Sequence, residues 1–112
     1  MRAKPAHLLQ GTLETLALKS LSWGPRHGYA IGRWIEELTE GTLTIEAGSL
    51  YPALYRLEQK KLIEAEWGTS DQGRPAKLYR LTAAGAEQMK REVQTWRRFS
   101  WAIAKVLDAK SA

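Results

Sequence analysis

A short helical pattern around residue 50 constrains the fold of this chain most strongly. Its apolar residues recur at a spacing that places them on one buried face of a helix: Leu50, Leu54 and Leu57. Ser49 is a good N-cap residue, and Pro52 is tolerated in a first turn, where no helical hydrogen bond is lost. The pattern predicts a helix that begins near Gly48 or Ser49 and ends near Lys61.

Two strand-like segments follow this helix and are separated by a polar loop. Residues 62–67 alternate partly between apolar and polar side chains, and residues 76–81 do so again. The intervening residues 68–75 are rich in Gly, Ser, Asp and Pro, which are the residue types that form turns. We therefore expect a β-hairpin with a long polar tip.

Two helices and a short connecting segment are expected before this unit. Apolar residues spaced three and four apart predict helices over residues 8–21 and 27–38, and Gly24 with Pro25 ends the first of them. Residues 41–45 are β-branched and alternating, so they form either a short edge strand or an extended linker.

A last helix is expected after Thr82, which is a suitable N-cap residue. Its apolar positions step by four and three in a heptad-like seam. The seam consists of Met89, Val93, Trp96, Ser100, Ile103 and Leu107. It is too apolar for a helix that faces only solvent.

The expected fold is mainly α with a small β-hairpin: a winged helix-turn-helix over residues 1–82 and a C-terminal helix over residues 83–112. A chain of 112 residues is most simply one such unit. In this architecture a helix enters the major groove of DNA and a hairpin reaches the minor groove. The formal net charge of +5 favours a polyanionic partner of this kind.

Several other classes of function lack the residues that they need. The chain contains no cysteine, so disulfides, zinc fingers and a cysteine nucleophile are excluded. Ser49 lacks nucleophile-elbow glycines, and His27 has no second ligand at metal-binding spacing. We expect no enzyme activity, no cofactor and no metal.

We also expect a cytoplasmic protein without a membrane segment. No apolar run approaches the roughly 20 residues that a membrane span needs. Residues 1–5 carry charge but no apolar core, so they do not predict a signal peptide.

Several strings of this sequence resemble the PadR-like transcriptional regulators. They are Gly11–Leu13, Gly24–Tyr29, Gly48–Leu54, Arg56–Glu58, Gly73–Lys77, Tyr79–Thr82 and Gly85. The resemblance implies a dimeric winged-helix repressor whose C-terminal helices form the dimer interface, here in a short form with a single such helix. It therefore assigns the seam of the last helix to contact with a second copy of the chain.

The candidate DNA-binding residues come from three segments. The set expected at the major groove is Ser49, Tyr51, Pro52, Arg56 and Lys60. Arg74 at the hairpin tip is expected in the minor groove, whose negative potential attracts arginine, and Lys77 along the phosphates. Tyr29 and Arg33 are candidates for backbone contacts, although Tyr29 could equally pack in the core. Glu58 lies near this face, so we expect it to pair with a cation of the protein itself.

The five tryptophans are many for this length. Trp23, Trp34 and Trp67 are expected to fill the core. Trp96 has two interpretations: an aromatic anchor of the dimer, which is favoured, or a contact to a small aromatic effector held between subunits, as the resemblance suggests.

The sequence thus favours a homodimeric, sequence-specific repressor of an inverted-repeat operator. The alternative is a winged-helix module that binds a protein partner without specific DNA binding. The retained cations argue against that alternative, and a steep salt dependence of binding would separate the two.

Overall fold

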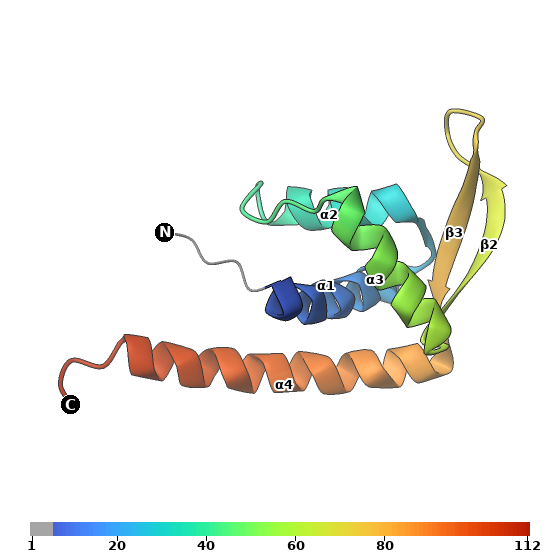
Figure 1. Ribbon diagram of the computed structural model, residues 1–112. Coiled ribbons are helices and arrows are strands. Elements are labelled where there is room, and N and C mark those ends of the chain that lie inside the picture. The colour runs from blue at the N-terminus through green and yellow to red at the C-terminus, as the bar shows by residue number, and fades with distance from the viewer. Residues whose placement is uncertain (1–5) are drawn as a thin grey trace.

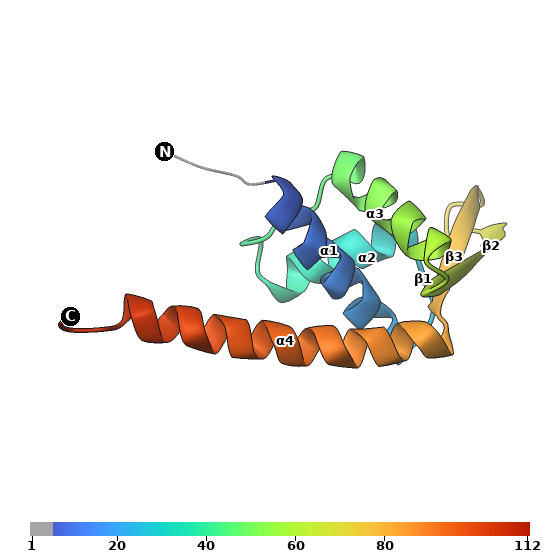
Figure 2. The same cartoon turned by 60° about the horizontal axis from the view of Figure 1, so that its bottom comes forward.

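The computed structural model describes the backbone of residues 6–112 and the side chains from residue 11 onward. Residues 1–5, where no signal peptide is expected, lie outside the described residues. The elements in chain order are α1 (Ala6–Ser20), the 3-10 turn η1 (Leu21–Trp23), β1 (Arg26–His27), α2 (Gly28–Leu38), α3 (Ala47–Gln59), β2 (Ile63–Thr69), β3 (Pro75–Leu81) and α4 (Ala83–Leu107). Helices α1, α2 and α3 stand together beside the hairpin of β2 and β3, and α4 runs along α1 (Figures 1 and 2).

The core lies between the three N-terminal helices, the base of the hairpin and the first turns of α4. Its buried residues are Leu13, Ala17, Leu18, Leu21, Ile31, Ile35, Leu50, Ala53, Leu54, Leu57, Ile63, Tyr79 and Met89. The predicted buried face of α3 is confirmed, since its three leucines are at most 3% exposed. The fold is the expected one: mainly helical, with a small antiparallel sheet.

Helix α3 begins earlier than predicted. Glu46 occupies the N-cap position, and its carbonyl accepts the N–H groups of Ser49 and Leu50 at 3.0 and 2.9 Å. Ser49 is therefore inside the helix, and Pro52 lies in the second turn rather than the first. The helix ends in a Schellman motif: the N–H of Leu62 donates to Leu57, and Lys61 adopts a left-handed φ of 63°.

The sheet has three antiparallel strands in the order β1-β3-β2. The hairpin register pairs Ile63 with Leu81 at its base and Thr69 with Pro75 near its tip. Strand β1 was not predicted, because its two residues become a strand only by pairing with β3. Residues 41–45 form no strand and are a linker of turns and extended chain.

The start of α4 is held against the end of α3. The predicted N-cap at Thr82 is confirmed: its hydroxyl accepts the N–H of Gly85 at 3.0 Å and donates to the carbonyl of Lys61 at 2.8 Å. Gly85 sits so close to the carbonyl of Leu62 that no side chain could be accommodated there. These contacts fix the direction in which α4 leaves the sheet.

The seam of α4 is divided between two environments. Met89 is buried in the core and Val93 packs against it, which corrects the assignment of Met89 to a dimer contact. From Gln94 to the end of the chain every residue is exposed, and this half of α4 projects beyond the other helices (Figures 1 and 2). Among the helices in residues 6–112, none is both long and apolar enough to cross a membrane.

The tryptophans expected in the core are mostly outside it. Trp34 packs partly buried against the core, but Trp23 is 65% and Trp67 69% exposed. Trp23 lies in the turn after α1, where it rests on the ring of Trp34. Trp67 lies on the outer half of β2, beyond the part of the hairpin that the helices cover.

Candidate nucleic-acid interface

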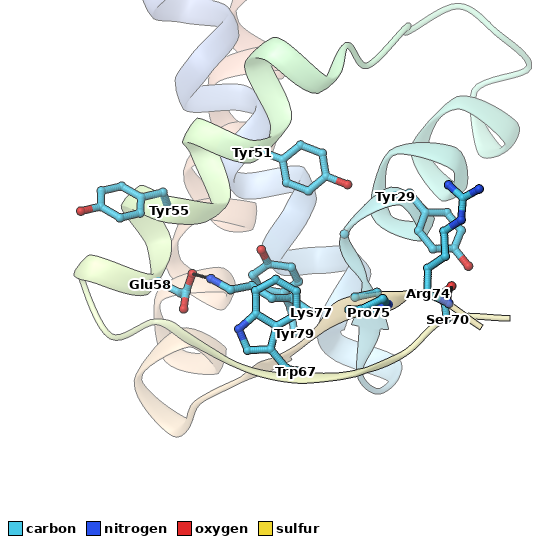
Figure 3. A pocket seen from close by; sticks show the side chains of 12 residues that line it. Tyr29, Tyr51, Tyr55, Glu58, Trp67, Ser70, Arg74, Pro75, Lys77 and Tyr79 are labelled. Atoms are coloured by element: carbon cyan, nitrogen blue, oxygen red, sulfur yellow. Dashed lines mark hydrogen bonds and ion pairs between the residues drawn. The ribbon is translucent and has the colours of Figure 1, made fainter. Parts of the chain in front are cut away.

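An open groove of about 590 Å³ separates α3 and the start of α2 from the hairpin. Figure 3 shows Trp67, Lys77 and Tyr79 next to one another on the hairpin, with Tyr51 across from them on α3. Arg74 and Tyr29 lie towards the other side of the groove from Tyr55 and Glu58. Residues far apart in the sequence thus line one surface, and five of their side chains are aromatic.

The α3 side of the groove carries two exposed tyrosines, Tyr51 and Tyr55. The ring of Tyr51 rests on the first residue of α2, where a Cβ on Gly28 would lie 2.8 Å from Cε1 of the ring. The lack of a side chain at Gly28 therefore lets the Tyr51 hydroxyl stay at the groove. Tyr55, one helical turn further along α3, is also exposed.

Arg56 and Lys60 do not line this groove. They point to α1, where Glu14 accepts Arg56 Nε at 2.6 Å and Lys60 Nζ at 3.4 Å. Arg56 Nη2 is buried and has no hydrogen-bond partner among the described residues. This corrects their placement in one DNA-facing set with Tyr51: a carboxylate from another helix binds both cations, and their positions lie on another side of α3.

The other two residues of the predicted major-groove set also lie outside the groove. Ser49 is partly buried and faces α1 and the linker. Pro52 is exposed on the surface of α3, adjacent in sequence to Tyr51.

Lys77 is held inside the groove by two neighbours. Its Nζ lies 3.3 Å from Glu58 Oε1 and 5.8 Å from the centre of the Trp67 ring. The predicted pairing of Glu58 with a cation of the protein is thereby confirmed. Burial raises the pKa of Tyr79, and the nearby Glu58 carboxylate adds to the rise, so the Tyr79 hydroxyl stays protonated at neutral pH.

Arg74 occupies the exposed hairpin tip, where Gly73 takes a left-handed φ of 75° and the N–H of Ser70 donates to the Arg74 carbonyl at 2.7 Å. No carboxylate among the described side chains pairs with its guanidinium. Tyr29 reaches the same end of the groove and stacks on the ring of His27. Arg33 lies in a neighbouring shallow hollow and pairs with Glu37 at 3.2 Å.

The structure therefore brings four of the nine predicted residues to the groove: Tyr29, Tyr51, Arg74 and Lys77. It adds Trp67, which the sequence analysis assigned to the core. The alternation of β2 carried a signal for it, because Trp67 shares one face of the strand with Ile63 and Ala65. The alternation of a strand shows which face a residue lies on. It does not show how far along the hairpin the helices pack.

The family model of PadR-like transcriptional regulators matches residues 17–91, from α1 to the first half of α4. The chain belongs to the PadR-like family of transcriptional regulators. Its family is therefore one of DNA-binding regulators rather than enzymes.

Similar proteins include solved structures of other transcriptional regulators. A Lysinibacillus sphaericus protein described as uncharacterized protein X is 32% identical over 89 residues, which are 80% of this chain and 82% of that protein. The structure of a transcriptional regulator from Clostridium thermocellum is similar with a TM-score of 0.79 at 27% identity, covering 88% of this chain and 96% of that one. The structure of a PadR family transcriptional regulator from Eggerthella lenta is also similar, with a TM-score of 0.74 at 32% identity. The match covers 93% of this chain and 88% of that one.

Proposed function

We propose that this PadR-like regulator is a homodimeric repressor that binds an inverted-repeat operator through the groove between α3 and the hairpin. The observation that carries the proposal is the convergence of tyrosine hydroxyls from α2 and α3 with Arg74 at the hairpin tip, whose guanidinium pairs with no carboxylate of the described residues. In this proposal α3 lies in a major groove, which is wide enough for a helix, and Arg74 enters the adjacent minor groove. Tyr29 and Arg33 contact the phosphates where α2 crosses the backbone.

The second copy is proposed to bind along the exposed half of α4. Large apolar residues there are exposed in the described part of the protomer: Trp96, Phe99, Ile103, Val106 and Leu107. Ser100 lies in the same seam. Residues 1–82 then form the DNA-binding part and residues 83–112 the dimerisation helix, whose first turns also complete the core. A two-fold axis between the copies accounts for an inverted-repeat operator.

Repression follows where the operator overlaps a promoter and the bound dimer excludes polymerase. A small aromatic effector would relieve it by binding better to a dimer with another spacing between the two DNA-binding units. Trp96 is the proposed effector contact, because it lines a hollow of about 450 Å³ between α1 and α4. Planar aromatic compounds should quench tryptophan fluorescence in the native protein and not in Trp96→Ala; a flat titration of the native protein counts against this role.

The test of the DNA-binding function is fluorescence anisotropy with a labelled fragment of the protein's own upstream DNA, compared with scrambled DNA at two salt concentrations. Binding to the upstream fragment that persists at a salt concentration where scrambled DNA dissociates supports a specific, self-regulating repressor. Equal, salt-sensitive binding to both fragments contradicts specificity for this DNA. Absence of binding to either favours the protein-partner alternative.

A further inference from the structure

The inner face of the hairpin runs without a break from the core into the groove. Along β2 this face presents Ile63, then Ala65, then Trp67, and burial declines in that order. Trp67 lies directly opposite Lys77 in the antiparallel register. The apolar surface that packs the base of the hairpin therefore continues outward as an exposed indole.

This indole belongs to a small cluster that already holds a cation. Lys77 Nζ lies over the Trp67 ring and pairs with Glu58 on α3. Figure 3 shows the three side chains together at the groove, and Figure 1 shows that the outer part of the hairpin stands clear of the helices. Nothing in the described chain covers the exposed part of the ring.

The chemistry around Trp67 points to one kind of occupant. A flat apolar ring stands beside Lys77, and the cation of Arg74 lines the same groove. A strand of the DNA backbone alternates in the same way between deoxyribose, which has apolar faces, and charged phosphate. Phosphate and sugar contacts of this kind position a protein on DNA without reading its sequence.

We infer that Trp67 is a DNA-contact residue, whose indole packs on a deoxyribose of the strand that crosses the groove between α3 and the hairpin. In the unbound protein Lys77 pairs with the Glu58 carboxylate. When DNA binds, Lys77 leaves Glu58 and pairs with the adjoining phosphate. The inference rests on the proposed function and names a contact of the same site.

The two halves of this contact respond differently to salt. A cation that neutralises a phosphate releases counterions, so it adds about 0.9 to the slope of log affinity against log salt. Packing of an uncharged indole on a sugar releases no counterions. Removal of Trp67 should therefore weaken binding without changing the slope, whereas removal of Lys77 should change both.

The experiment compares Trp67→Ala with Trp23→Ala by anisotropy against the labelled upstream fragment over a series of salt concentrations. Trp23 is a matched control, since it is 65% exposed against 69% for Trp67 and also lies beneath a lysine, Lys19, at 4.8 Å. We expect Trp67→Ala to weaken binding about tenfold with an unchanged slope, as loss of one buried aromatic contact would do. Trp23→Ala should bind like the native protein. Lys77→Ala should make the fall of log affinity with log salt less steep by about 0.9.

Fluorescence gives a second measurement that does not depend on the alanine variant folding. Unlabelled DNA should quench the native protein and Trp23→Phe to the same absolute extent, and Trp67→Phe distinctly less. Two results overturn the Trp67 contact and leave the proposed function standing. One is a folded Trp67→Ala protein that binds DNA with the affinity of the native protein. The other is equal quenching by DNA in the two phenylalanine variants. A native protein that binds no DNA overturns both.

Discussion

At the scale of single residues, the five cations that the sequence predicted to contact DNA differ in whether the protein already neutralises them. Arg33, Arg56, Lys60 and Lys77 each pair with a carboxylate. Arg74 has no such partner among the described side chains and stands at the exposed hairpin tip. A phosphate that meets Arg74 displaces no carboxylate, so this arginine should contribute the most binding free energy of the five.

The substitution Arg74→Ala should therefore weaken DNA binding strongly. It should also make the fall of log affinity with log salt less steep by about 0.9, since one phosphate contact is lost. The thermal midpoint should not change, because the side chain is exposed and makes no hydrogen bond or ion pair with the described residues. Anisotropy over a salt series and a thermal melt measure the two effects. Arg33→Ala, which removes a cation already paired with Glu37, is the control and should have the smaller effect; unchanged affinity in Arg74→Ala contradicts the minor-groove role.

At the scale of elements, one carboxylate of α1 binds two cations of α3, in addition to the apolar packing of that helix. Glu14 is only 15% exposed and binds Arg56 and Lys60, one helical turn apart on α3. Arg56 already has one buried nitrogen without a hydrogen-bond partner in the described residues. The contact thus holds the helix that carries Tyr51 and Tyr55, although neither tyrosine takes part in it.

The substitution Glu14→Gln should lower the free energy of unfolding by about 1–3 kcal/mol, because it leaves a partly buried guanidinium without its counterion. Urea denaturation measures this loss as a shift of the midpoint. Glu37→Gln is the matched control: its pair with Arg33 is 69% exposed on both sides, and such pairs contribute about 0–1 kcal/mol. Equal losses in the two variants would show that Glu14 contributes no more than a surface charge.

At the scale of the whole molecule, the protomer is elongated because half of α4 projects beyond the other helices of the described chain. Its principal extents are 58 × 31 × 22 Å. The exposed half carries a row of large apolar side chains, whereas monomers rarely leave such a contiguous patch in solvent. In the proposed dimer, the apolar row of one copy packs against the same row of the second copy, so both rows are buried.

The substitution Ile103→Glu should convert the dimer to a monomer, because it places a charge in the proposed seam. Sedimentation equilibrium measures the mass, and circular dichroism checks that the helices persist. Gln94→Glu adds the same charge to the opposite side of α4 and should remain dimeric. A dimer in both variants would move the interface away from this seam.

The features that the sequence determined by itself are those that depend on near neighbours. Helical spacing and strand alternation reported the three leucines of α3, the hairpin and the cap at Thr82, because each arises from residues a few positions apart. The tertiary structure alone decided which charges meet: Glu14 reaches Arg56 across 42 positions, and Glu58 reaches Lys77 across 19. It also decided that Trp67 is exposed, since the extent to which helices cover a hairpin is set by how the elements pack and not by the pattern of any one strand.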